Sequence, residues 1–250
     1  MMQTGRMVSS YQKKNLCGVA LAAIVFGLTI ACLGTQWYSW NTTFNSVTTS
    51  ASGSSAVTYQ QINSSKMYYD LDGIRTEIKR TNDAIATTTR TEYSRTAMPK
   101  VFATVKLAQA FVLIGLILSF IVATLLLVFV FDPIRNKVIF SFGMTLTRFI
   151  LLILVLLTLA SVIIAFLGFV GLTNAFKADN QDCNDGPCRV FSSSVTSQFG
   201  TTSRLEEWGP QAGWYVVLSS IPVALILLVV VFVNKFPLPI DSEASSGEAL

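Results

Sequence analysis

Two cysteines in the last third of the chain carry the clearest candidate chemistry. Cys183 and Cys188 are separated by four residues that include Gly186 and Pro187, so a turn can bring the two sulfur atoms together. This spacing favours a structural disulfide, with a redox-active pair as the alternative. Membrane thiol oxidoreductases use a two-residue spacer and further cysteines, and two thiolates without neighbouring ligands make no metal site. We therefore expect a disulfide, in a compartment outside the cytosol.

Other reactive side chains are sparse. The sequence contains no histidine, which removes the commonest general base and metal ligand. Charged residues make up 13% of the chain, against roughly 25% in soluble domains. The net charge of +4 is small, so no nucleic-acid partner is expected. The composition predicts a protein that is not an enzyme and that binds neither a cofactor nor a metal.

Four apolar runs separate the polar segments of the chain and must position them. They are residues 16–37, 107–131, 149–176 and 211–233, and none contains Asp, Glu, Lys or Arg. About 20 apolar residues cross a bilayer as a helix, and each run reaches that length. A cleaved signal peptide is the alternative for the first run, which exceeds the 7 to 15 residues of a signal core. The short connection 132–148 makes the second and third helices antiparallel, so we expect an all-α four-helix transmembrane bundle.

The helices lack the charged side chains that mark ion paths and proton relays in membranes. Instead, small residues recur at spacings of three or four, which lets helix backbones approach closely in lipid. We expect these residues to pack within one molecule, with dimerisation as the alternative. They are Ala23, Gly27 and Ala31 in the first run, Gly115, Ser119 and Ala123 in the second, and Ala165, Gly168 and Gly171 in the third.

Aromatic residues gather at the ends of the first and fourth runs that border the long polar loops, 38–106 and 177–210. Trp and Tyr favour the membrane–water interface, so an interfacial position is predicted for them. The residues are Trp37, Tyr38, Trp40, Trp208 and Trp214.

Both polar loops carry signs of folded structure. Residues 57–62 have the composition of a strand, as do residues 189–195. Leu71, Ile74, Ile78 and Ile85 recur at helical spacing, which predicts an amphipathic helix over about 67–90.

The distribution of charges and acceptor motifs indicates the sides of the membrane. The terminal segment 1–15 has three basic residues and no acidic one, and the short connection between the second and third runs is also basic. Asn41 and Asn63 each begin a glycosylation motif. We therefore expect both termini, 1–15 and 234–250, in the cytoplasm, both polar loops outside, and the plasma membrane as the location.

The arrangement resembles the claudin superfamily, which includes claudins, peripheral myelin protein relatives and auxiliary channel subunits. The resemblance rests locally on two segments, Gly-Thr-Gln-Trp-Tyr-Ser-Trp at 34–40 and Lys-Leu-Ala-Gln-Ala-Phe-Val-Leu-Ile-Gly at 106–115. The resemblance covers about 12–235 and implies a small extracellular β-sheet to which 57–62 and 189–195 would belong. Claudins have two cysteines in the first outer loop and this loop has none, so tight-junction barrier function is not implied.

These observations favour a non-enzymatic organiser, acting as an adhesion protein, scaffold or accessory subunit through its outer loops and helix faces. Expected partners are the lipid bilayer and other membrane proteins or a second copy. Glu248 and Leu250 also fit a carboxy-terminal ligand for a cytoplasmic PDZ domain. The alternatives are an oligomeric pore or channel subunit and a thiol oxidoreductase that uses Cys183 and Cys188.

Overall fold

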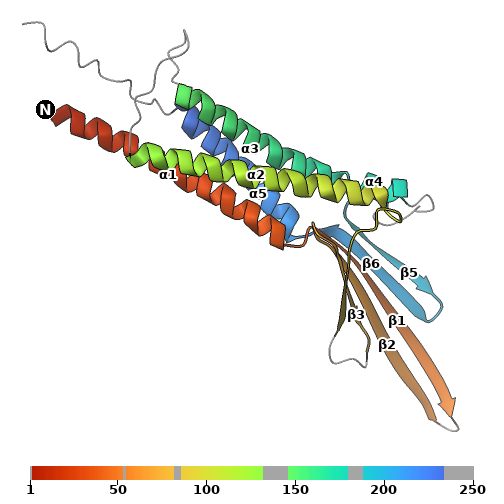
Figure 1. Ribbon diagram of the computed structural model, residues 1–250. Coiled ribbons are helices and arrows are strands. Elements are labelled where there is room, and N and C mark those ends of the chain that lie inside the picture. Colours follow the sequence, from red (N-terminus) through yellow and green to blue (C-terminus); the bar gives the residue numbers. More distant parts are fainter. Residues whose placement is uncertain (1, 53–54, 82–85, 132–145, 180–187, 234–250) are drawn as a thin grey trace, which may run out of the picture. The chain divides into compact units, whose positions relative to one another are not determined.

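Four long helices dominate the computed structural model, which describes residues 2–52, 55–81, 86–131, 146–179 and 188–233 (Figure 1). They are α1 (Met2–Gly34), α2 (Pro99–Phe131), α3 (Leu146–Val170) and α5 (Ala212–Val233), and a short α4 (Leu172–Asp179) follows α3. All four long helices are long and apolar enough to cross a membrane. The candidate spans are Asn15–Gly34, Pro99–Val128, Arg148–Val170 and Ala212–Val233. The predicted four apolar helices are therefore confirmed.

Several helix boundaries differ from those expected, and the largest shift is in α1, which begins at Met2 instead of residue 16. α2 begins eight residues earlier than 107, at Pro99, because proline suits the first position of a helix. The side chain of Asp179 caps this end: Lys100 N–H donates to Oδ1 at 2.9 Å and Val101 N–H donates to Oδ2 at 2.8 Å. The third apolar run is interrupted at Gly171, whose N–H donates to the carbonyls of both Leu167 and Gly168.

The chain forms two compact units, and the first contains residues 1–27, 114–161 and 220–250. All four long helices contribute to its apolar core, in which van der Waals packing holds helices together in lipid. Close approach is evident at Gly18, where a Cβ would lie 3.3 Å from Leu126 Cδ1. The buried core residues are Ala22, Val122, Leu126, Leu151, Val155, Leu227 and Val231.

The second unit, residues 28–113 and 162–219, contains a six-stranded antiparallel sheet (Figure 1). The strand order is β4-β3-β2-β1-β6-β5, so strands from both polar loops share one sheet. The strands are β1 (Tyr38–Ser52), β2 (Ser55–Tyr69), β3 (Ile74–Lys79), β4 (Thr87–Thr91), β5 (Ser193–Phe199) and β6 (Thr202–Pro210). The predicted strand 57–62 lies within β2, whereas 189–195 only overlaps the start of β5.

The amphipathic helix expected over about 67–90 is wrong, because β3 and β4 occupy this region together with the end of β2. Ile74 and Ile78 share a face in a strand as well as in a helix, because a spacing of four is a multiple of the strand period of two. Gly73 forms the turn before β3, where a Cβ would lie only 2.9 Å from the Thr91 carbonyl oxygen. The threonines of β4 are β-branched, which favours a strand.

Candidate interaction surface

Trp37 joins the helical segments of the second unit to the start of the sheet. Its side chain is 0% exposed, and its indole N–H donates to the Cys32 carbonyl at 2.8 Å. Its ring centre lies 4.9 Å from that of Phe169 in α3. The Trp37 carbonyl accepts a hydrogen bond of 2.9 Å from Gln211 N–H, directly before α5. The end of α1, α3 and the start of α5 are therefore linked at this side chain.

A group of aromatic rings packs at the end of the sheet where β1 begins and β2 ends. Tyr38 and Tyr69 are direct partners in β1 and β2, with ring centres 5.9 Å apart. The Tyr38 hydroxyl donates to the Phe191 carbonyl at 3.0 Å, and the Tyr69 ring lies 5.3 Å from that of Phe176. Burial raises the pKa of Tyr69 to about 12. This end of the sheet is thus a dry aromatic core.

The aromatic residues predicted at the membrane–water interface differ in burial. Trp37, Tyr38 and Trp208 are buried, and the Trp208 indole N–H donates to the Val190 carbonyl at 2.9 Å. These three pack inside the protein, and the interfacial position of the group stays a prediction. Trp40 and Trp214 are half-buried.

Beyond the aromatic core, the two faces of the sheet differ in character. Side chains of directly paired residues share a face, and successive residues alternate between faces. The register therefore places a set of large apolar side chains on one face, here called the apolar face. Most of these side chains are exposed, up to 69% for Phe199. The apolar face comprises Trp40, Phe44, Met67, Ile78, Val195 and Phe199.

Two charged residues of β6, Arg204 and Glu206, lie on the apolar face itself, between its residues on β1 and those on β5. The Arg204 guanidinium lies 5.4 Å from the centre of the Phe44 ring and pairs with Glu206. Arginine and aromatic residues are both enriched in protein interfaces, and arginine is attracted to the face of an aromatic ring. The apolar face is therefore divided by a charged pair.

The opposite face, here called the polar face, carries hydrophilic side chains in the rows nearest the helices, whereas Val47, Ile62 and Leu205 lie farther along it. Lys66, Asn41 and Glu207 lie side by side on β2, β1 and β6. Ser39 and Tyr68 pair in the row next to them. The sheet is therefore amphipathic.

The sequence-predicted glycosylation sites fall within strands. Asn41 lies on the polar face, where its Nδ2 donates to Glu207 Oε2 at 3.3 Å. Asn63 pairs with Phe44 in the apolar-face register, and its Oδ1 is buried without a hydrogen-bond partner in the described residues. Glycosylation of both residues stays a prediction.

Several predicted features lie outside the described residues. Cys183 is one of them, so its disulfide with the buried Cys188 stays a prediction. Glu248 and Leu250, the proposed PDZ ligand, also lie there. Within the described residues, Cys17 and Cys32 are free cysteines.

The small residues of the helices divide into two groups. Gly115, Ser119 and Ala165 are buried and Ala123 and Gly168 are half-buried, as expected for packing within one molecule. Ala23, Gly27 and Ala31 are exposed, and a Cβ on Gly27 would meet nothing within 4 Å. Packing within one molecule therefore does not account for the stripe on α1.

Asp70, Asp72 and Glu77 are acidic residues that could influence the ion preference of a pore, and two of them are paired. Asp72 pairs with Arg90, and Glu77 lies 3.5 Å from Arg75. Burial raises the pKa of Asp70, whose backbone carbonyl accepts a hydrogen bond of 2.7 Å from the Tyr93 hydroxyl. No group of three or more potential metal ligands occurs among the residues that the structure describes. These pairings give the pore alternative no support.

Asp179 and Gly213 have structural roles that were not recognised from the sequence. Asp179 accepts a hydrogen bond from Lys100 N–H, 79 residues earlier in the chain, so no local sequence motif indicates this cap. Gly213 lies against the Trp37 ring, and only its position directly before Trp214 hinted at a crowded helix entry.

Comparison with known proteins adds no relative: no protein-family model matches the chain, and no curated protein is significantly similar to it. The geometry of the sheet therefore carries the functional argument.

Proposed function

We propose that the chain is a non-enzymatic integral membrane protein that acts as an adhesion protein, scaffold or accessory subunit. The observation that carries this proposal is the exposed apolar face of the sheet. The sheet lies outside the cell, and both termini lie in the cytoplasm of a plasma-membrane protein. The resemblance to the claudin superfamily supports the same assignment.

The apolar face is suited to a protein partner. An antiparallel sheet with one apolar face normally covers a core with that face. Here side chains such as Phe44, Val195 and Phe199 are exposed instead. Exposed apolar patches bordered by polar residues mark protein interaction sites, and interface centres are enriched in Phe, Trp, Met and Arg. The partner is the outer surface of another membrane protein or of a second copy.

Site-specific photocrosslinking in intact cells tests this assignment. A photoreactive residue at Val195, on the apolar face, is expected to capture a protein partner, whereas the same residue at Ser194, on the polar face, is not. Phe199→Gln should weaken the captured complex by about tenfold, because a large aromatic contact contributes on the order of 1 to 2 kcal/mol. Gln198→Asn, at the adjacent position on the polar face, is the matched control.

The outcome that contradicts the proposal is equally specific. Equal capture from Ser194 and Val195, or an unchanged complex after Phe199→Gln, would remove the apolar face from the interaction. A solitary monomer in native membranes would remove the organiser function as a whole.

The cytoplasmic tail is proposed to add a second contact through Glu248 and Leu250, which a PDZ domain would bind. Deleting the last three residues should release such a domain and leave the crosslink from Val195 unchanged.

A further inference from the structure

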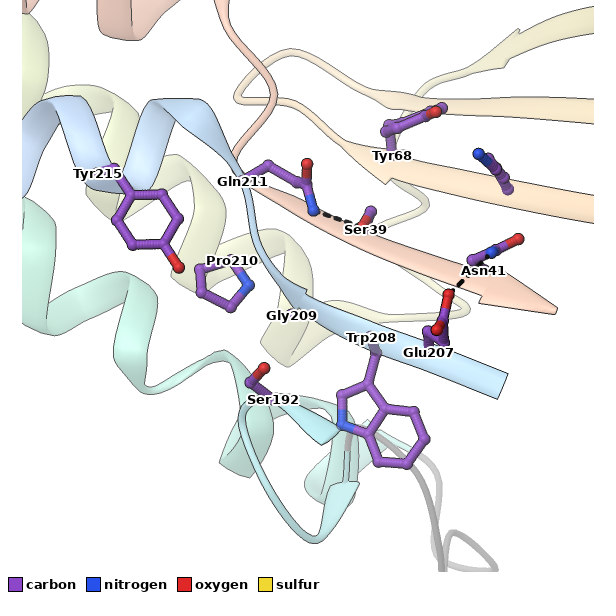
Figure 2. A pocket seen from close by; sticks show the side chains of 11 residues that line it. Ser39, Asn41, Tyr68, Ser192, Glu207, Trp208, Gly209, Pro210, Gln211 and Tyr215 are labelled. Carbon is purple, nitrogen blue, oxygen red and sulfur yellow. Dashed lines mark hydrogen bonds between the residues drawn. The ribbon is translucent and has the colours of Figure 1, made fainter. Parts of the chain in front are cut away.

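A pocket of about 350 Å³ opens on the polar face, at the end of the sheet that adjoins the start of α5 (Figure 2). It belongs to the second unit and is distinct from the apolar face. Its walls come from β1, β2, β6 and the first turn of α5. The polar side chains that line it include those of Ser39, Asn41, Lys66, Glu207, Gln211 and Tyr215.

Opposite charges stand at two sides of this pocket. Lys66, Asn41 and Glu207 form one row across three neighbouring strands, which places the Cα atoms of Lys66 and Glu207 about 10 Å apart. Lys66 has no ion-pair partner among the described residues, and the neighbouring Glu77 pairs with Arg75. Among the described residues, the Glu207 carboxylate accepts a single hydrogen bond, from Asn41 Nδ2. The pocket therefore offers a cation and a carboxylate that do not neutralise each other.

Neutral acceptors lie between the two charges. Asn41 Oδ1 is buried and has no hydrogen-bond partner in the described part of the chain. Gln211 Nε2 donates to Ser39 Oγ at 2.8 Å, which leaves the Gln211 carbonyl oxygen available (Figure 2). A buried acceptor without a partner costs free energy, and a donor group on a ligand would remove that cost. These acceptors suit a ligand with several N–H donors.

The pocket lies beside two ends of the membrane spans. Gln211 directly precedes the span Ala212–Val233, and Tyr215 lies in the first turn of that span. Ser39 follows the span Asn15–Gly34 by five residues. The headgroup layer extends roughly 5 to 8 Å beyond the hydrocarbon on each side of a bilayer. A ligand in the pocket is therefore at the depth of lipid headgroups.

We propose that this pocket binds the phosphoethanolamine headgroup of a membrane phospholipid. Lys66 pairs with the phosphate, while Glu207 and the Gln211 carbonyl oxygen accept hydrogen bonds from the primary ammonium. A choline headgroup has no N–H donors, so it would leave the acceptors of Glu207 and Gln211 unpaired. An aromatic cage for choline is also incomplete here, because Arg75 lies 4.8 Å over the Tyr68 ring and Trp208 is only 4% exposed, which leaves the exposed Tyr215 as a single open ring of the lining.

Native mass spectrometry of the full chain tests the proposal, using detergent micelles with equal amounts of phosphatidylethanolamine and phosphatidylcholine. Wild type is expected to retain the ethanolamine lipid preferentially. Glu207→Gln should abolish this preference, a change of about tenfold for one charge-assisted hydrogen bond. Lys66→Met should weaken both lipids equally, because both contain the phosphate. Glu206→Gln and Lys79→Met, which change charges outside the pocket, are matched controls.

Soluble glycerophosphoethanolamine separates a lipid from a free ligand. It should displace the retained lipid only at high concentration if the lipid is the natural occupant. Binding of the soluble compound with no retained lipid would overturn the lipid assignment. Equal retention of the two lipids by wild type, or a preserved preference in Glu207→Gln, would overturn the proposal as a whole. The wild-type comparison needs no variant to fold.

Discussion

At the scale of single residues, Gly213 determines how closely α5 approaches Trp37. A Cβ at this position would lie 2.6 Å from Trp37 Cδ1 and 3.0 Å from the Gln36 carbonyl oxygen. The Trp37 ring is fully buried and packs on Phe169, so it has little room to move. No larger residue fits at 213 without displacing the Trp37 ring or the backbone at Gln36.

We expect Gly213→Ala to lower the free energy of unfolding by about 1 to 3 kcal/mol, the usual cost of overpacking a buried site. Chemical unfolding in detergent, followed by tryptophan fluorescence, measures the change. Gly27→Ala is the matched control, because a Cβ there meets nothing within 4 Å. Equal stability of the two variants would show that the Trp37 contact is not tight.

The buried tyrosines predict a loss of stability at alkaline pH. Burial raises the pKa of Tyr69 to about 12, and it also raises the pKa values of Tyr38 and Tyr93 above their ordinary range. In the unfolded chain these hydroxyls ionise near pH 10, whereas in the folded protein they keep their protons. Stability is therefore fully present below pH 10 and falls as the pH rises to about 12.

A titration followed by tyrosinate absorbance checks this expectation. The three buried tyrosines should ionise only above pH 10 or together with unfolding. Ionisation of all tyrosines near pH 10 in the folded protein would contradict the dry aromatic core.

At the scale of elements, the start of α2 is held by a side chain from α4. Asp179 accepts hydrogen bonds from the N–H groups of Lys100 and Val101, which have no partner within the helix. A carboxylate is also favoured at the positive end of the helix dipole. This contact fixes α2 and α4 to each other at their ends.

Asp179→Ala is expected to lower the free energy of unfolding by about 0.5 to 2 kcal/mol, the usual cost of losing an N-cap. Asp179→Asn should cost less, because the amide oxygen still accepts one of the two hydrogen bonds. Thermal unfolding of the purified protein measures the difference. Lys177→Ala, on the exposed side of α4, is the control, and equal effects of the two alanine variants would argue against the cap.

The elements were not all equally predictable from the sequence. Charge-free runs identified the four long helices, because water-free surroundings exclude charge over the whole length of a span. The strands β3 and β4 were missed, because Ile74 and Ile78 satisfy both periodicities. The cap at Asp179 depends on a contact distant in sequence. Local patterns contain no information on such contacts.

At the scale of the whole molecule, periodicity could not tell which side of each helix meets protein. Lipid and core are equally apolar, so the residues that face them look alike in sequence. The buried Gly115 and the exposed Gly27 occur in similar patterns of small residues. The apolar face of the sheet escaped notice for a related reason, since its residues come from four strands distant in sequence.

The difference in burial between Gly115 and Gly27 predicts opposite outcomes for two similar substitutions. Gly115→Leu should destabilise the protein by several kcal/mol or prevent folding, because the site is buried. Gly27→Leu should leave the monomer folded and its unfolding temperature nearly unchanged, because its surroundings are open. Comparison of the two variants by size-exclusion chromatography and thermal unfolding checks both expectations.

The direct connection between sheet and helices has a mechanical consequence. β1 begins four residues after α1 ends, and β6 ends two residues before α5 begins. The carbonyls of Gln36 and Trp37 accept hydrogen bonds from Gly213 and Gln211 N–H, so the two junctions are clamped together. Tension applied along β1 loads its hydrogen bonds to β6 in shear, since these bonds run perpendicular to the strands. A pull on the tip of the β1–β2 hairpin is therefore transmitted to two helices at once.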